Sequence, residues 1–382
     1  MEAAAAPSQT QTRPFDFAEV LTRMAEERAS DVHLSPGFRP AIRLRGSIVP
    51  LDEYEPLTAQ ETRDTVYSLL NDDQRKRFES HKQLDLAYAV PGVARFRVNC
   101  FFQRGSISAA FRRIPHEIPK LGELGLPRVL EELTRKPRGL VLVTGPTGSG
   151  KSTSLAAMLD IINEERDEHM LTIEDPIEFL HNHKRCIVNQ REIGADAEDF
   201  SSALKAALRE DPDVILVGEM RDLETMSTAL TAAETGHLVF ATLHTQSTAQ
   251  TVDRIIDIFP AGQQAQVRMQ LSIALQGVVT QQLLPTIDGA GRVVGAEVLI
   301  PTPAVRNLIR EGKTHQIYSA IQTSGAIGMQ TMDAHLAQLV RMGRISRQLA
   351  EQRASVPEEL SRLLGAAPPP TNGAAAMTTN GA

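Results

Sequence analysis

Short apolar runs alternate with helical stripes through the middle of this chain. Five of the runs have the length and β-branched content of buried strands, and amphipathic stretches separate them. Strands that alternate with helices predict an α/β fold, in which a parallel sheet carries helices on both faces. The runs expected as strands are 139–144, His169–Glu174, Cys186–Gln190, Val214–Gly218 and Leu238–Leu243.

The pattern changes on either side of this region. Residues 13–113 begin with a helical stripe and continue with alternating runs at 84–90, 94–102 and 106–114, which predict an antiparallel meander in a small α+β domain. Two prolines make 114–119 a linker to a second domain at 120–355. Beyond Thr248 we expect mostly helix, with one β-like run at Val293–Ile300. The low-complexity start, 1–12, and the tail, 356–382, are expected to be disordered.

The first strand of the α/β region leads directly into a glycine-rich loop. Residues 145–152 fit the pattern G-x-x-x-x-G-K-[ST], and the apolar residues that follow have helical spacing. A strand, loop and helix in this order aim backbone N–H groups and a helix N-terminus at phosphates. Lys151 is expected on the β/γ-phosphates and Ser152 on Mg²⁺. The predicted nucleotide-binding residues are Gly145, Pro146, Thr147, Gly148, Ser149, Gly150, Lys151, Ser152 and Thr153.

Composition limits the partners, the cysteine chemistry and the cellular location expected for this protein. The net charge of −7 excludes a generally basic surface for nucleic acid. Cys100 and Cys186 stand far apart, which predicts free thiols rather than a disulfide scaffold or a zinc site. No apolar run approaches the ~18 residues of a membrane span, and the first residues lack the features of a signal peptide. We therefore expect a cytoplasmic protein that reaches a membrane only through partners.

Two carboxylates are candidates for the chemistry of phosphate cleavage, which needs Mg²⁺ and an oriented water. Glu219 follows the apolar run Val214–Gly218, but Gly218 occupies the place where an aspartate commonly precedes such a glutamate. Glu174 and Asp175 end the strand beginning at His169 and could supply the second carboxylate. Acidic strand ends beside a phosphate loop favour a catalytic role over an ordinary solvated position.

Two histidines bracket the last strand of the set. His237 precedes it and His244 follows it, so the two side chains are expected at opposite ends. The carboxyl ends of parallel strands face the ligand crevice, which makes His244 the better candidate to sense the γ-phosphate. A lone histidine is more often structural, and position alone leaves both roles open for His244.

Four blocks together resemble the secretion ATPase superfamily, which drives type II secretion, type IV secretion and type IV pili. They are similar to its Walker A, Asp box, Walker B and His box motifs. A further block, VRNLIRE at 305–311, resembles a motif of the type IV pilus retraction ATPases. The four blocks are GPTGSGKS at 145–152, TIEDPIEF at 172–179, DPDVILVGEMRD at 211–222 and TGHLVFATLHT at 235–245.

The resemblance implies a PAS-like first domain and a RecA-like P-loop ATPase core, with ATP between the domains and six copies in a ring. It implies that Glu174 polarises the attacking water and that Glu219 acts on Mg²⁺. His237 and His244 match the His box. Arg97 and Arg112 match arginines that approach the phosphates, where a guanidinium neutralises developing charge.

The implied output is pilus retraction, and with it twitching motility and DNA uptake. The implied partners are the pilus platform protein of the inner membrane and a second retraction ATPase, with no direct contact to nucleic acid.

Related functions are the alternatives. Extension and secretion ATPases generally carry a tetracysteine zinc motif and a longer N-terminal region, and this chain has no cysteine after Cys186. A PilU-like accessory retraction ATPase is closely similar. A scaffold that binds ATP without hydrolysing it is disfavoured by the intact lysine, serine and glutamates. A nucleic-acid motor is disfavoured by the acidic balance.

Overall fold

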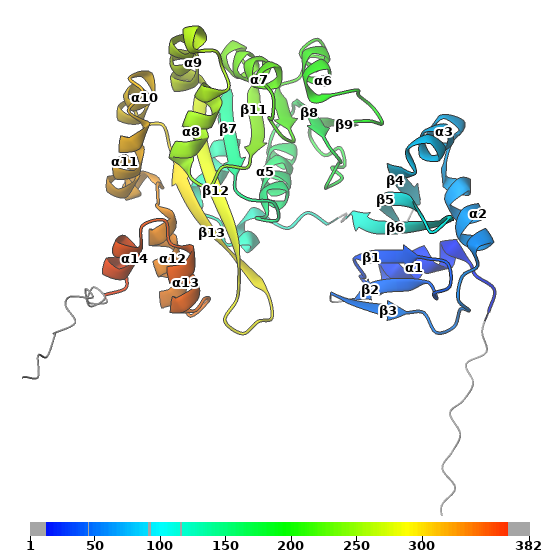
Figure 1. The fold of residues 1–382 in the computed structure, drawn as a ribbon. Coiled ribbons are helices and arrows are strands. Elements are labelled where there is room, and N and C mark those ends of the chain that lie inside the picture. The colour runs from blue at the N-terminus through cyan, green and yellow to red at the C-terminus, as the bar shows by residue number, and fades with distance from the viewer. Residues whose placement is uncertain (1–12, 45, 91–92, 115–116, 366–382) are drawn as a thin grey trace, which may run out of the picture. The chain divides into compact units, whose positions relative to one another are not determined.

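The computed structural model describes residues 13–365 except 45, 91–92 and 115–116, and the chain forms two compact units (Figure 1). The first unit extends to Glu117 and includes two short later segments, Pro176–His181 and Glu192–Asp196. The second unit holds the remaining residues from Ile118 onward. The chain thus passes from the first unit to the second between Glu117 and Ile118, and two short segments from later in the sequence group with the first unit.

The first unit is built on a six-stranded sheet in the order β3-β2-β1-β6-β5-β4. Neighbouring strands pair antiparallel throughout, which confirms the meander expected from the alternating runs. Its helices are α1 (Phe17–Glu26), α2 (Ala59–Leu69) and α3 (Asp72–His81). Its strands are β1 (Asp31–Leu34), β2 (Ala41–Leu44), β3 (Ser47–Pro50), β4 (Gln83–Val90), β5 (Ala94–Gln103) and β6 (Ser106–Ile114).

Apolar and polar residues alternate along β5, and the apolar ones mark the buried face of this sheet. Ala94, Phe96, Val98 and Cys100 are buried in one apolar cluster, while Arg97 between them is exposed. The helical stripe of α1 packs into the same cluster, since its buried residues are Val20, Leu21 and Met24. The first unit therefore has a core of its own, and its sheet presents charged side chains on the other face.

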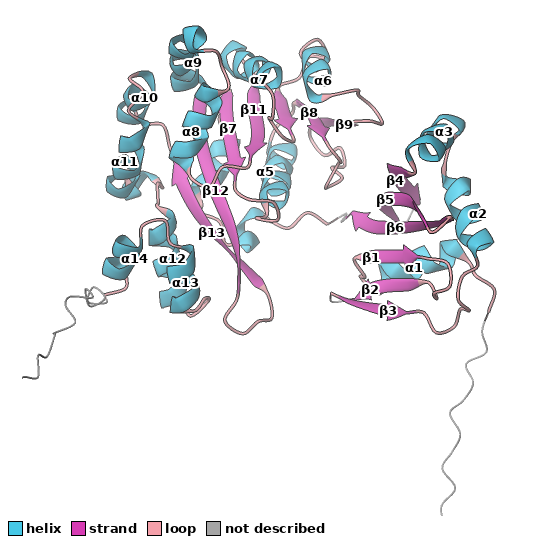
Figure 2. Cartoon of the chain, in the orientation of Figure 1, coloured by secondary structure: helices cyan, strands magenta, loops and turns pink. Residues whose placement is uncertain are grey.

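The second unit contains a seven-stranded sheet in the order β13-β12-β7-β11-β10-β8-β9, and Figure 2 shows helices packed around it. The four strands β7, β11, β10 and β8 pair parallel to one another. All five strands expected here are confirmed to within two residues. The strands are β7 (Gly139–Thr144), β8 (His169–Glu174), β9 (Ile187–Glu192), β10 (Val214–Val217), β11 (Leu238–Leu243), β12 (Leu275–Pro285) and β13 (Arg292–Leu299).

Eleven α-helices and three 3₁₀ turns complete the described part of this unit. The turns cover Leu121–Leu124, Thr314–Gln316 and Gly325–Ile327. The helices are α4 (Val129–Thr134), α5 (Lys151–Glu165), α6 (Phe200–Ala207), α7 (Leu223–Thr235), α8 (Thr248–Asp257), α9 (Ala261–Ala274), α10 (Pro303–Arg310), α11 (Ile317–Thr323), α12 (Met332–Arg341), α13 (Arg347–Arg353) and α14 (Pro357–Leu363).

Strand β12 corrects the prediction that the chain beyond Thr248 is helical apart from one run. It pairs parallel with β7 and antiparallel with β13, so the sheet is mixed rather than wholly parallel. Gly277 lets this strand approach α4 closely, because a Cβ there would lie 2.8 Å from the Leu133 side chain. The tight packing, together with the β-branched residues that follow Gly277, favours a strand over the helix that the apolar pattern suggested.

Helix α14 corrects the expectation that all of 356–382 is disordered. Leu360 is fully buried in a cluster with Leu336 of α12. Asp333 of α12, also fully buried, accepts hydrogen bonds from the backbone nitrogens of Ser355 (2.8 Å) and Val356 (3.0 Å). These contacts order the chain through α14. The rest of the expected tail from 366 onward, like 1–12, lies outside the described residues.

Candidate active site

The phosphate loop connects β7 at the centre of the sheet to α5. Every residue of β7 is buried, so the loop starts from a fixed point. Gly145 has φ +133°, and a Cβ on it would lie 2.3 Å from the carbonyl oxygen of Gln281 in β12. Gly148 and Gly150 also have positive φ, +78° and +91°. Three positions of the motif thus require glycine for physical reasons, which ties the sequence pattern to the loop geometry.

Lys151 opens α5 and folds back over the loop. Its Nζ donates to the carbonyl oxygens of Gly145 (2.9 Å) and Pro146 (3.1 Å). Burial lowers the pKa of Lys151, while the charge of Glu219 acts in the opposite direction. The ammonium group is therefore held over the N-terminus of α5, where an anion is favoured by the helix dipole and by unpaired backbone N–H groups.

Ser149, inside the loop, is 2% exposed, and its Oγ has no hydrogen-bond partner among the described residues. A buried hydroxyl without a partner is costly, and it is relieved by a ligand that accepts a hydrogen bond. Phosphate oxygens are such acceptors. The loop thus offers a hydroxyl donor in addition to its backbone N–H groups and Lys151.

The absence of an aspartate before Glu219 has a steric cause. Strands β8 and β10 run parallel with Ile173 beside Val217, and the N–H of Gly218 donates to the Ile173 carbonyl at 2.7 Å. A Cβ on Gly218 would lie 3.0 Å from that carbonyl oxygen and 3.2 Å from the Cα of Glu174. The backbone at the end of β8 fills the space in which an aspartate side chain would begin. Glu174 is the carboxylate at this point of the sheet.

Glu174 is 8% exposed, and two neutral side chains donate to it. Thr172 Oγ1 donates to its Oε1 at 2.7 Å, and Gln190 Nε2 of β9 donates to the same atom at 3.3 Å. These hydrogen bonds orient the carboxyl group. An oriented carboxyl group at the carboxyl edge of the sheet suits the positioning of a water molecule.

Glu219 contacts the Arg221 guanidinium and the His244 ring. Arg221 Nε lies 2.6 Å from its Oε1, and Arg221 Nη2 donates to its Oε2 at 2.7 Å. His244 Nε2 lies 3.0 Å from Oε1. Burial by itself raises the pKa of Glu219, but the Arg221 hydrogen bond and the charges of His244 and Arg221 outweigh it and lower the pKa below its usual value. Glu219 is consequently a carboxylate at neutral pH.

The two predicted histidines lie at opposite ends of β11. His244 follows β11 and reaches Glu219, so the structure brings it to the carboxyl edge of the sheet. His237 precedes β11, its carbonyl accepts from the N–H of Gly139 at the start of β7, and its Nδ1 lies 3.0 Å from the Ala232 carbonyl. Six strand residues, about 20 Å, separate it from His244, so the structure does not bring His237 to the loop.

Arg97 and Arg112 belong to the first unit, where β5 and β6 place them directly opposite each other. Both side chains are exposed, and Arg112 Nε also donates to Asp31 Oδ1 at 2.9 Å. Like charges directly opposite each other destabilise a sheet. Asp31 supplies one anionic partner for this pair of guanidinium groups. Arg95 forms an ion pair with Glu192, since its Nη2 lies 3.2 Å from the Glu192 carboxylate.

Three side chains that sequence reasoning missed complete the site. Thr172 and Gln190 hold Glu174, and Arg221 holds Glu219. Thr172 is two residues before Glu174 on the same strand, and side chains two apart share a face, which is a signal that could have been used. Gln190 comes from a different strand, and Arg221 lies in a loop, so neither followed from a local pattern.

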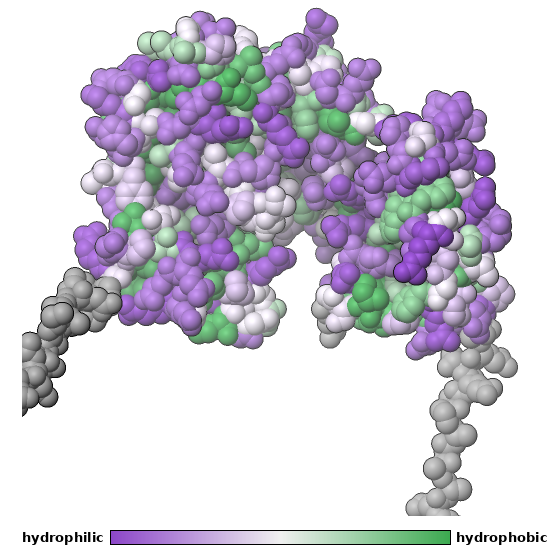
Figure 3. Space-filling view, in the orientation of Figure 1, coloured by the Kyte–Doolittle hydropathy of each residue, from purple (hydrophilic) through white to green (hydrophobic). Residues whose placement is uncertain are grey.

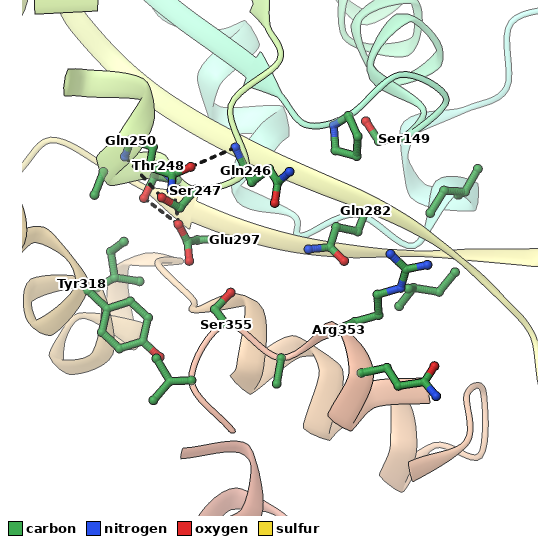
Figure 4. A pocket seen from close by; sticks show the side chains of 18 of the residues that line it. Ser149, Gln246, Ser247, Thr248, Gln250, Gln282, Glu297, Tyr318, Arg353 and Ser355 are labelled. Carbon is green, nitrogen blue, oxygen red and sulfur yellow. Dashed lines mark hydrogen bonds between the residues drawn. The ribbon is translucent and has the colours of Figure 1, made fainter. Parts of the chain in front are cut away.

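Two hollows adjoin the loop within the second unit. The larger, of about 800 Å³, lies between residues 146–149 and the C-terminal helices. Figure 4 shows Glu297 there beside Thr248, with Tyr318, Arg353 and Ser355 across the cavity. Glu297 Oε1 accepts from the N and the Oγ1 of Thr248, both at 2.8 Å. The smaller hollow, of about 310 Å³, is lined mainly by Leu124, Leu126, Gly150, Thr153, Leu283, Arg292 and Val294.

The residues beside the loop can be compared with the ligands that Mg²⁺ requires. Mg²⁺ is typically held by one or two carboxylates, waters and substrate phosphates, and the oxygens of Ser152 and Glu219 are ligands of that chemistry. Among the described residues there is no cluster of three or more His, Cys, Asp or Glu side chains that could hold a metal without a phosphate. The residues present fit a magnesium ion that arrives together with the nucleotide.

Hydrophilic side chains are spread over both units on the face drawn in Figure 3. Within the described ranges, no helix combines the length and the apolar character needed to cross a bilayer.

Comparison with known proteins places this geometry in a family. The family profile described as type II/IV secretion system protein matches residues 15–354. The type IV pilus retractation ATPase PilT of Pseudomonas aeruginosa is 55% identical over 343 residues, which cover 90% of this chain and 99% of that protein. The type IV pilus ATPase PilU of the same organism is 43% identical, over 91% of each chain. A crystal structure of the pilus retraction motor PilT with bound ADP has a TM-score of 0.86 and 51% identity, covering 91% of this chain and 100% of that chain.

Proposed function

The chain belongs to the type II/IV secretion system protein family, it is an ATPase of that family, and we propose that its work is the retraction of type IV pili. The observation that carries the proposal is the convergence of Lys151, Glu174 and Glu219 at one edge of the sheet, in a chain that matches a retraction ATPase over nearly its whole length. Identity to the type IV pilus ATPase PilU is lower, 43% against 55%, which supports the role of PilT rather than that of PilU.

In the proposed mechanism the loop and the start of α5 bind the phosphates of ATP. Backbone N–H groups, Lys151 and the buried Ser149 hydroxyl supply the donors, and the smaller hollow beside Thr153 has apolar walls suited to the purine base. Mg²⁺, held by Ser152 and Glu219, would neutralise phosphate charge. A triphosphate bound in this way has its γ-phosphate directed toward the carboxyl edge of the sheet.

Glu174 is assigned to the attacking water. Its fixed carboxylate orients the water and accepts its proton as the oxygen attacks the γ-phosphorus. His244 is assigned to the sensing of the γ-phosphate through its contact with Glu219. Arg97 and Arg112 are assigned to the neutralisation of charge on the phosphate oxygens. His237, at the far end of β11, is assigned a structural role at the junction of α7 and β11.

Hydrolysis is converted to movement when the γ-phosphate leaves and the contacts that it made are lost. A change in the arrangement of the two units about residues 114–119 is the proposed output, of the hinge type. We assign the protein to the cytoplasm, as a ring of six copies that acts on the pilus platform protein of the inner membrane, with a second retraction ATPase as a further partner. Twitching motility and DNA uptake follow from retraction.

The genetic test uses the chromosomal Lys151→Ala variant in the native host. We expect cells that still assemble pili, carry more of them than the parent and do not twitch, because extension continues without retraction. Loss of pili in this strain would identify an extension or secretion ATPase instead. Normal piliation and normal twitching would contradict a motor role in this pilus system. An exposed-site variant, Arg77→Ala on α3, is the matched control.

A further inference from the structure

The carboxylate of Glu219 has both oxygens engaged by protein cations. Arg221 approaches in a two-point contact, with Nε 2.6 Å from Oε1 and Nη2 2.7 Å from Oε2, and His244 Nε2 adds a third contact at 3.0 Å from Oε1. A guanidinium matched to a carboxylate in this way takes the lone pairs that a metal ion would use. The side chain assigned to Mg²⁺ is therefore occupied by the chain itself.

The Arg221 side chain is largely exposed to solvent beyond its contact with Glu219. Its side chain is 75% exposed, whereas that of Glu219 is 18% exposed. It lies in the short segment between β10 and α7, and that segment is anchored by other residues: the N–H of Met220 donates to the Thr242 carbonyl, and Asp222 caps α7. The guanidinium can thus move away from Glu219 without disturbance of β10 or α7.

One partner of this ion pair can be exchanged for another cation. The exposed Arg221 guanidinium is solvated by water when it leaves, whereas the half-buried Glu219 carboxylate still requires a cationic partner. A divalent cation that arrives with nucleotide phosphates offers a closer and doubly charged partner for the same oxygens. Arg221 and the cation cannot share both oxygens in the geometry observed, so the two compete.

We propose that Arg221 is a positioning residue that occupies the Glu219 carboxylate in the nucleotide-free chain and sets the Mg²⁺ concentration at which nucleotide binds. The inference rests on the proposed function, because it takes Glu219 to be the residue that meets the metal. It adds a competing cation within the chain, whose release accompanies the arrival of the magnesium nucleotide.

The test is a Mg²⁺ titration of nucleotide binding, measured with a fluorescent ADP analogue on the full chain, so that no turnover is required. We expect Arg221→Ala and Arg221→Gln to lower the Mg²⁺ concentration for half-saturation by about fivefold or more. Arg221→Lys should fall between these variants and the parent, because an ammonium makes a single-point contact. In a Glu219→Gln background, removal of Arg221 should produce no further change.

The matched control is Arg185→Ala. Arg185 makes a similar two-point contact with Asp167, is 53% exposed, and belongs to another part of the unit. It should leave the titration unchanged. An unchanged half-saturation in both Arg221→Ala and Arg221→Gln would overturn the inference while the ATPase proposal stands, and an increase would show that Arg221 assists the metal. A parent chain that binds no magnesium nucleotide would overturn both.

Discussion

Gly218 shows how a single residue decides which carboxylate serves the site. A parallel strand lies so close to it that a Cβ would lie 3.0 Å from the Ile173 carbonyl oxygen and would press on the backbone of that strand. The sequence showed that an aspartate was missing, and it showed that Glu174 ended another strand. It did not show that Gly218 and Glu174 lie next to each other, because the register between β8 and β10 exists only in the folded sheet.

Gly218→Ala is expected to lower both stability and turnover. The added methyl group meets the Ile173 carbonyl and the Glu174 Cα, which are backbone atoms that cannot rotate away. We expect a loss of about 1–3 kcal/mol in the free energy of unfolding, and a reduced kcat because Glu174 shifts. Chemical denaturation and phosphate release are the measurements. Gly262→Ala on α9, where a Cβ meets nothing within 4 Å, is the control and should retain both.

Elements differed in how far the pattern of the sequence could predict them. Strands β7, β8, β10 and β11 were predictable because each is a short apolar run buried on both faces. Strand β12 was not, because its apolar residues also fit a helix and its pairing with β7 is a long-range contact. Helix α14 was missed because its sequence carries one deeply buried residue, Leu360, whose partners lie on α12.

Leu360→Ala tests whether α14 is an integral element of the second unit. Truncation of a fully buried leucine leaves a cavity, so we expect a loss of about 2–5 kcal/mol in unfolding free energy. Glu358→Ala, two residues away on the exposed side of α14, should change it by no more than about 0.5 kcal/mol. Equal stability of the two variants in denaturant titrations would return α14 to the disordered tail that the composition suggested.

Glu297 ties β13 to α8 and gives the unit a pH-dependent contact. Burial raises its pKa, and the hydrogen bonds from Thr248 oppose this only in part. A carboxyl whose native pKa is raised stabilises the fold below its ordinary pKa, and this contribution is lost as the pH rises through the native value. At higher pH the native state therefore holds a buried charge at a cost.

Glu297→Gln retains an oxygen for Thr248 and removes that charge. We expect its melting temperature to exceed that of the parent at pH 8, by a margin that shrinks as the pH falls toward the ordinary carboxyl range. Glu224→Gln is the control of opposite sign, since Lys205 lowers the pKa of that exposed glutamate. A margin for Glu297→Gln that does not vary with pH in thermal scans would contradict the account of this contact.

At the scale of the molecule, each unit has its own apolar core, and the proposed chemistry assigns roles to residues of both. The second unit holds the loop and the carboxylates, and the first holds the facing arginines 97 and 112. The antiparallel sheet of the first unit and the parallel strands β7, β11, β10 and β8 of the second followed from sequence patterning. The partners of the carboxylates did not, because they come from strands and loops that only the fold brings together. In the proposed function, ATP hydrolysis moves the two units relative to each other, and this movement drives pilus retraction.

The most direct test of this account is magnesium-dependent phosphate release by the purified chain and two variants, with nucleotide binding measured in parallel. We predict hydrolysis by the parent. Glu174→Gln should bind nucleotide as the parent does and lose about 100-fold or more in turnover, because the water is no longer activated. Lys151→Ala should lose turnover and bind about 10- to 100-fold more weakly. Full turnover by Glu174→Gln, or no magnesium-dependent hydrolysis by the parent in any assembly state, would contradict the account.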